Sequence, residues 1–125
     1  MTDSDASDPA RRPLAVTSAA EVQSTLPALG RRAGADAGDP QVGMLLMNTS
    51  DLGRVGVWTC EPGGWPIKDR VDTEASYILS GRVRITDDAT GEVREVGPGD
   101  YVFMPAGWSG RWDVIETARK VFAIY

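Results

Sequence analysis

The chain has 125 residues, of which 42% are hydrophobic and 25% are charged, a composition typical of one globular domain with a modest core. Thirteen basic and 18 acidic residues give a net charge of -5, which disfavours binding to a phosphate backbone, so we expect no nucleic-acid partner. No segment has the roughly 18 to 20 consecutive apolar residues that span a bilayer, and the polar N-terminus does not resemble a secretory signal. We therefore expect no membrane partner and a cytoplasmic protein.

Residues 1–13 are rich in Asp, Ser, Pro and Arg, and we expect them to form a disordered tail. Ser18 and Glu21 have the spacing of a capping box, which predicts a short helix over residues 18–26 that Pro27 ends. The glycines and charges of residues 30–40 indicate a loop. The predicted organisation is a tail at 1–13, a helix and loop at 14–39, and a folded body at 40–125.

From residue 41 onward, short apolar runs alternate with Gly, Pro, Asp and Asn, a pattern typical of β-strands separated by turns. Eight strands of four to six residues are expected: Val42–Met47, Val55–Cys60, Ala75–Leu79, Arg82–Thr86, Val93–Val96, Tyr101–Met104, Gly110–Val114 and Lys120–Ile124. Close spacing without a helical period predicts an all-β, antiparallel sandwich or barrel.

Histidine is absent and Cys60 is the only cysteine, so Ser-His-Asp and Cys-His catalysis and an internal disulfide are excluded. Without imidazole, acid-base chemistry would fall to carboxylates, amines or phenols.

Two motifs then resemble those of the cupin superfamily. Gly99-Asp100-Tyr101-Val102-Phe103-Met104-Pro105-Ala106-Gly107 is similar to the second cupin motif, and Glu74-Ala75-Ser76-Tyr77-Ile78-Leu79-Ser80-Gly81 is similar to the end of the first. Only 17 residues separate Gly81 from Gly99, as in small single-domain cupins. The resemblance implies an antiparallel jelly-roll β-barrel.

Further residues, including Trp58, Pro62-Gly63, Trp112 and Lys120, resemble the cupin group named after the ureidoglycine aminohydrolase domain. That group also contains a cupin associated with ethanolamine utilisation. Many of its members have no assigned activity, so the resemblance is a better guide to fold than to reaction. It also implies a homodimer, since cupins often pair and a small β-rich domain gains stability by pairing.

In metal-dependent cupins three histidines and one glutamate bind the metal. On the motif spacing, these positions fall at Lys68, Arg70, Glu74 and Gly110. Ammonium and guanidinium groups do not bind metals, and one carboxylate supplies too few ligands for Zn²⁺, Mn²⁺ or Fe²⁺. We expect no metal and no cofactor, although Asp69 and Asp72 could in principle join Glu74 in an oxygen-ligand site.

If Lys68 and Arg70 point into the barrel, one carboxylate faces two cations, and the spare cation would bind a small anionic metabolite. The predicted ligand contacts are Lys68, Arg70 and Glu74, with Trp58 and Trp112 as apolar wall. Tyr77 is a further candidate contact, although strand alternation turns it away from Glu74. The alternative is that Lys68 and Arg70 point outward and Glu74 makes a structural hydrogen bond.

Two other functions stay open. The protein could be an enzyme with Glu74 as catalytic base, either a metal-independent isomerase or lyase or an aminohydrolase like the namesake of the group. It could also be a structural or regulatory domain whose barrel is filled by its own side chains. Trp65 and Trp108 flank turns and are expected at the rim of the barrel.

Overall fold

The computed structural model describes residues 13–50 and 53–125, so the tail expected at 1–13 lies, apart from Pro13, outside the described residues. These residues form one short helix, α1 (Ala19–Val22), and nine strands. The strands are β1 (Ala28–Arg31), β2 (Ala37–Gly38), β3 (Gln41–Ser50), β4 (Gly53–Cys60), β5 (Gly63–Ile67), β6 (Glu74–Asp87), β7 (Val93–Val96), β8 (Tyr101–Met104) and β9 (Gly110–Ile124). No helix within the described ranges is long and apolar enough to cross a membrane.

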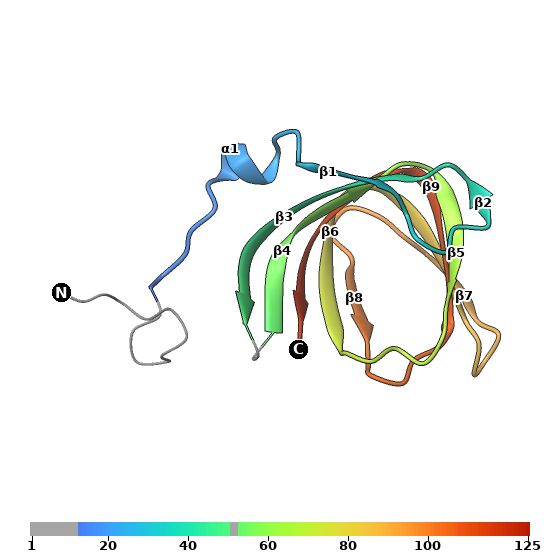
Figure 1. Cartoon of the computed structure of the whole chain (residues 1–125). Coiled ribbons are helices and arrows are strands. Elements are labelled where there is room, and N and C mark those ends of the chain that lie inside the picture. Colours follow the sequence, from blue (N-terminus) through green and yellow to red (C-terminus); the bar gives the residue numbers. More distant parts are fainter. Residues whose placement is uncertain (1–12, 51–52) are drawn as a thin grey trace.

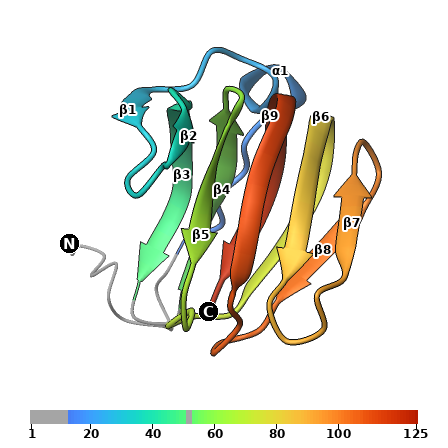
Figure 2. The ribbon, with the colours of Figure 1, turned by 90° about the vertical axis from the view of Figure 1, so that its right-hand side faces the viewer.

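The two longest strands, β6 and β9, pair with each other along most of their length and are shared by two halves of one curled sheet (Figures 1 and 2). One half has the order β1-β3-β4-β9-β6-β8 and the other has the order β2-β5-β9-β6-β7. Every pairing is antiparallel. The expected all-β jelly-roll architecture is therefore confirmed, as a sheet that curls into a half-barrel.

Each of the shared strands had been predicted as two separate strands. Gly81 interrupts the apolar alternation of β6, and the register with β9 shifts on both sides of it. Its φ of +86° lies in the left-handed region that favours glycine, which lets β6 bend from one half of the sheet into the other. Residues 115–117 of β9 lie opposite this bend and are all exposed, which interrupts the burial alternation of β9. The sequence therefore suggests two strands where the structure has one.

The segment before residue 41 differs most from expectation. The capping box at Ser18 and Glu21 is present, but α1 ends at Val22 rather than at residue 26. Residues 24–26 leave the helix because Ser and Thr favour turns and Pro27 disfavours helical geometry in the residue before it. The predicted loop at 30–40 contains the end of β1 and the whole of β2, which pair with β3 and β5 respectively. Polar, glycine-rich segments of this kind form strands only because neighbouring strands offer them hydrogen-bond partners.

The core lies inside the curl of the sheet. The even-numbered residues of β9 from Trp112 to Phe122 are buried, apart from Glu116 at the bend. Trp58, Trp65 and Ile78 pack with them from β4, β5 and β6. This alternation directs one face of each strand into the curl, and Glu74, Trp58 and Trp112 lie on that face.

Candidate functional site

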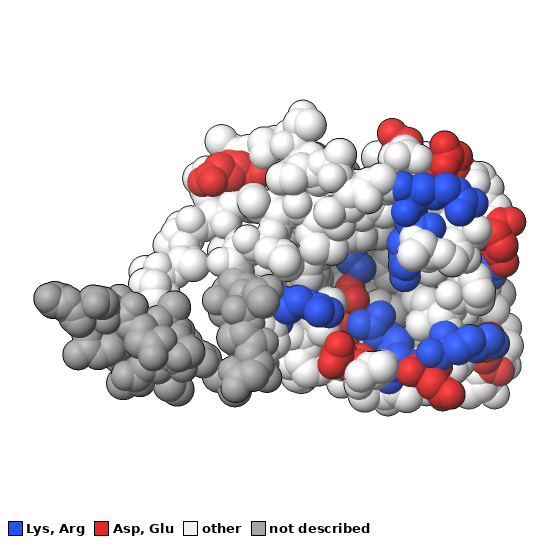
Figure 3. Space-filling view, viewed as in Figure 1, with Lys and Arg blue, Asp and Glu red and all other residues white. Residues whose placement is uncertain are grey.

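A cavity of about 420 Å³ opens within the curl of the sheet. Its wall comes from residues 29–33 and from strands β3, β4, β5, β6, β8 and β9, together with Arg70 in the loop before β6. Figure 3 shows Lys and Arg side chains around a hollow on this face of the molecule. The volume lies within the roughly 300–1,000 Å³ of small-molecule pockets, so the barrel is not filled by its own side chains.

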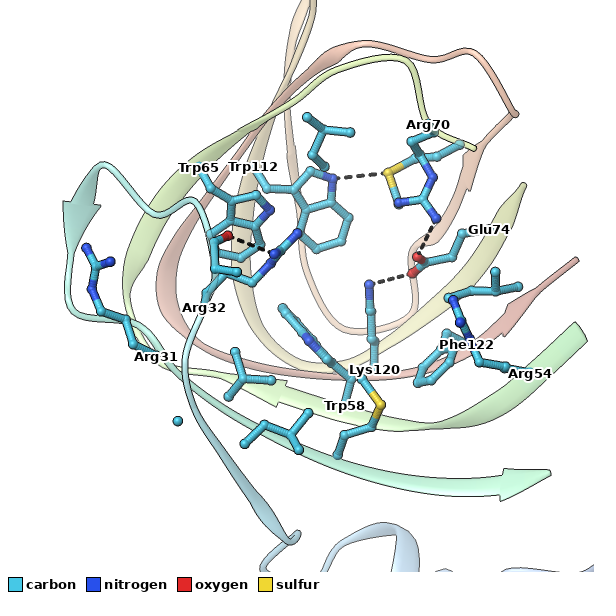
Figure 4. A pocket seen from close by; sticks show the side chains of 18 residues that line it. Arg31, Arg32, Arg54, Trp58, Trp65, Arg70, Glu74, Trp112, Lys120 and Phe122 are labelled. Carbon is cyan, nitrogen blue, oxygen red and sulfur yellow. Dashed lines mark hydrogen bonds and ion pairs between the residues drawn. The ribbon is translucent and has the colours of Figure 1, made fainter. Parts of the chain in front are cut away.

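Glu74, the first residue of β6, is the centre of the polar part of the wall (Figure 4). Its Oε2 lies 2.5 Å from Lys120 Nζ and accepts a 2.7 Å hydrogen bond from Ser76 Oγ, and its Oε1 lies 3.2 Å from Arg70 Nη2. Burial raises the pKa of Glu74, but the Lys120 ammonium, the Ser76 hydroxyl and the Arg70 guanidinium together outweigh burial and hold that pKa below its ordinary value. Glu74 is therefore an ionised carboxylate at neutral pH.

Lys120 reaches Glu74 from the neighbouring strand β9 and is 6% exposed. Its Nζ lies 4.4 Å from the ring centroids of both Trp58 and Trp112, within the range of cation–π contacts. Burial lowers the pKa of the Lys120 amine, and the attraction of Glu74 opposes this effect only in part. The amine is thus held between one carboxylate and two aromatic faces.

Three tryptophans form the apolar part of the wall. Trp58 meets Trp65 and Trp112 edge to face, at centroid distances of 6.3 and 6.0 Å, and Trp65 stacks with Trp112 at 6.4 Å. Trp58 and Trp112, the two tryptophans expected as apolar wall, both line the cavity. Trp65, which was expected at the rim, is only 3% exposed, because residues 63–67 form strand β5 and pair with β9. Trp108 is half-buried.

The charges along the wall do not balance. Arg32 follows β1, and its guanidinium carbon lies 4.9 Å over the ring of Trp65. No carboxylate of the described residues lies within ion-pair distance of Arg32, and burial lowers the pKa of its guanidinium. Arg70 and Lys120 share the single carboxylate of Glu74. The interior part of the wall therefore carries three cations and one anion.

The positions that correspond to metal ligands do not fit a metal ion. Arg70 points inward but pairs with Glu74, so both carboxylate oxygens already contact cations. Gly110 has no side chain, and the Trp108 ring and the Thr86 carbonyl fill the space where a Cβ would lie. Across residues 13–50 and 53–125, no group of three His, Cys, Asp or Glu side chains is close enough to hold an ion.

The oxygen-ligand alternative does not form around Glu74 either. Asp69 is exposed, and Asp72 lies 3.9 Å from Arg54 across the rim of the cavity. A divalent cation placed beside Glu74 would meet the ammonium of Lys120 and the guanidinium of Arg70.

Two predicted ligand contacts lie outside the cavity. The Lys68 side chain is 72% exposed and pairs with Asp88 at 3.0 Å, because residue 68 lies beyond the end of β5 on an exposed loop. Tyr77 lies on the outer face of β6, as strand alternation requires, and is 43% exposed. Neither side chain can contact a ligand beside Glu74.

Lys120 and Arg32, two charged residues of the cavity wall, are not among the predicted site residues. Lys120 and Trp112 are both even-numbered residues of β9, so strand alternation places their side chains on the same, inward face. This signal could have identified Lys120. Arg32 carries no such signal, because it lies in a glycine-rich segment whose sequence lacks strand alternation.

The chain matches the family model described as the EutQ-like cupin domain over residues 48–122, more than half of its length. No curated protein matches it. Among solved structures, a Salmonella typhimurium protein assigned as ethanolamine utilization protein Q is similar with a TM-score of 0.61 and 19% identity, over 77% of this chain and 76% of that one. The Clostridium difficile EutQ protein has a TM-score of 0.59 and 19% identity, with coverage of 72% and 75%.

A protein of unknown function from Pseudomonas syringae pv. tomato has a TM-score of 0.73 and 22% identity over 83% of this chain. The chain spans only 46% of that protein. At these identities the likeness to solved structures shows the fold alone. The family match, together with the confirmed jelly-roll fold and both motifs, establishes that this chain belongs to the EutQ-like cupin domain family.

Proposed function

We propose that this cupin binds a small organic anion in its cavity and that it does so without a bound metal ion. The observation that carries the proposal is the excess of cations over carboxylates in the wall, namely Arg32, Arg70 and Lys120 against Glu74. Lys120 is buried and Arg32 and Arg70 are half-buried. Cations that are wholly or partly removed from water without full compensation cost free energy in the empty protein, and an anionic ligand relieves that cost.

Arg32 is best suited to hold the ligand's carboxylate. A guanidinium offers five N–H donors in a planar fork that matches a carboxylate. Within the described residues, Arg32 uses its side chain in one hydrogen bond, from Nη1 to the Ala33 carbonyl at 2.8 Å. Trp58, Trp65 and Trp112 supply a flat apolar surface for the rest of the ligand.

A thermal-shift screen of small carboxylates and ureido acids tests this proposal. We expect several carboxylates to raise the melting temperature of the wild-type protein, because ligands that bind only the folded state stabilise it. Arg32→Ala and Arg70→Ala should lose most of the shift, while Lys68→Ala, which removes an exposed cation outside the cavity, should retain it. Stabilisation by Zn²⁺ or Mn²⁺, or equal shifts in all three variants, would contradict the proposal.

The catalytic alternative would use Glu74 as a general base, as in an aminohydrolase of the ureidoglycine type. Both carboxylate oxygens of Glu74 already contact cations, which leaves neither oxygen free to take a proton from a substrate and favours binding over this chemistry. Ammonia release from ureido acids that bind in the screen would favour the alternative. The third possibility, a domain whose barrel is filled, disagrees with the cavity of about 420 Å³.

We further propose that the protein forms a homodimer through the outer face of β6, β8 and β9. Tyr77, Tyr101 and Phe103 are 43, 73 and 61% exposed there, beside an apolar hollow lined by Ala75, Val121 and Ala123. Placing a second copy over this face would remove large aromatic surface from water.

Replacing both Tyr101 and Phe103 by Glu is expected to convert the dimer to a monomer in light-scattering measurements of molar mass. Val93→Glu, which adds a charge at an exposed position on β7, is the control and should stay dimeric. A wild-type protein that is monomeric at all concentrations would show that the aromatic face does not self-associate.

A further inference from the structure

We propose that Lys120 is a nucleophilic amine that forms a reversible imine with a small 2-oxo acid held in the cavity. This inference rests on the proposed function, because the excess cations of the cavity would bind the carboxylate of the oxo acid. It adds a covalent step to that function, and it specifies a ligand that has a carbonyl group next to its carboxylate.

The position of Lys120 differs sharply from that of the only other lysine. The sequence contains two lysines, Lys68 and Lys120. Lys68 is exposed and lies outside the cavity, whereas Lys120 is buried in the wall with Nζ against the faces of Trp58 and Trp112. Amines in such desolvated positions are the ones that proteins use to form imines, because burial disfavours the ammonium form.

The groups around Lys120 match what imine formation requires. Glu74 Oε2, at 2.5 Å from Nζ, is within direct proton-transfer distance. Arg70 lies on the other oxygen of Glu74, and Arg32 faces the same cavity, so both are placed to hold a carboxylate near the amine. The positive charges of Arg70 and Arg32 also lower the pKa of Lys120, which increases the fraction of free amine.

The step balances without any further reactant. The Lys120 ammonium transfers one proton to Glu74, and the free amine lone pair attacks the ketone carbon to form a C–N bond while the C=O π pair moves to oxygen. A second nitrogen proton passes to that oxygen, giving a carbinolamine. Glu74 then returns its proton to the hydroxyl, the C–O bond breaks and water leaves. The products are a protonated imine on Lys120, an ionised Glu74 and one water.

Reductive trapping tests the inference. The full-length protein is incubated with pyruvate and sodium cyanoborohydride, and the N-(1-carboxyethyl)lysine content of each lysine peptide is measured by mass spectrometry. We expect modification at Lys120 to exceed modification at Lys68 by at least about tenfold. Lys68 is the internal control for ordinary surface reactivity. The Lys120 preference should disappear in urea, where both lysines are exposed.

Lys120→Arg keeps a positive charge but has no amine that can form the imine, so it should abolish trapping at position 120. Lys68→Arg should leave trapping at Lys120 unchanged. Lactate, the 2-hydroxy analogue of pyruvate, separates the two proposals in a thermal-shift assay. Stabilisation by pyruvate and lactate with no excess adduct at Lys120 would overturn the imine and leave anion binding intact. No stabilisation by either acid and no adduct would contradict both proposals.

Discussion

Replacing Glu74 by Gln is expected to lower the free energy of unfolding by about 3–5 kcal/mol, the cost of removing one partner from a buried ion pair. Glu74 and Lys120 are 5 and 6% exposed, and the substitution leaves Lys120 and Arg70 without their shared carboxylate. Urea denaturation followed by tryptophan fluorescence measures the effect, since Trp58 and Trp112 lie directly against the pair.

The double variant Glu74→Gln with Lys120→Met is the matched control for this result. It removes both charges of the closest pair, so it should recover a large part of the stability lost in Glu74→Gln alone. If the double variant is as unstable as the sum of the two single variants, the cost does not arise from an uncompensated cation, and the electrostatic account of the site fails.

The ion pair of Glu74 and Lys120 also makes the free energy of unfolding depend on pH, in a direction that follows from the pKa of Glu74. The folded-state pKa of Glu74 lies below its ordinary value of 4.5, so the unfolded chain binds more protons between the two values. The stabilisation by Glu74 is thus present above pH 4.5 and is lost as the pH falls through the folded-state pKa. The stability gap between the wild type and Glu74→Gln should accordingly shrink as the pH is lowered from 4.5.

Gly81→Ala is expected to lower the free energy of unfolding by about 2–5 kcal/mol. The loss has two causes: the strain of a left-handed backbone conformation in a residue that has a Cβ, and the close contacts that this Cβ would make. At a φ of +86°, a Cβ on residue 81 would lie 2.2 Å from the carbonyl oxygen of Thr117 and 2.6 Å from the Cα of Ala118. Both contacts are with backbone, which cannot move without disturbing the pairing of β6 and β9. That pairing is what holds Glu74 beside Lys120.

Gly91→Ala separates the two contributions, because Gly91 has a φ of +73° and no atom within 4 Å of its would-be Cβ. This control should lose only the strain of the left-handed backbone, about 1–2 kcal/mol. Thermal or urea unfolding of the two variants checks the difference. Equal losses at the two positions would show that the close approach of β6 and β9 at Gly81 is unimportant for stability.

The sequence predicts the strands that are delimited by turn residues. It misses the strands that form only because an adjacent strand pairs with them. β7 and β8 match their predicted bounds, because turns at 87–91 and 97–100 delimit them. β5 begins in a Pro-Gly-Gly turn signal, and β1 and β2 have no alternation, so only their partners β9, β3 and β5 make them strands.

The sequence predicted Glu74 and Trp112 as site residues but missed Lys120, which contacts Glu74 directly. The motif placed Glu74 correctly, and alternation placed Trp112 correctly, because both lie on regular strands. Lys68 was a predicted ligand contact on motif spacing, with an outward direction as the alternative, because spacing does not fix the direction of a side chain in a loop. The structure shows the outward direction. The cation that does reach Glu74 from the far end of the chain is Lys120, 46 residues away, a contact that only the pairing of β6 and β9 creates.

Calorimetric titration of chelator-treated wild-type protein with a small carboxylate and with its neutral amide tests the central claim most directly. A cavity with more cations than carboxylates predicts that the carboxylate binds, that its affinity falls as salt is added, and that the amide binds at least about tenfold more weakly, the loss of one charged hydrogen bond. Equal affinity for the acid and the amide, or binding that appears only after Zn²⁺ or Mn²⁺ is restored, would contradict the account.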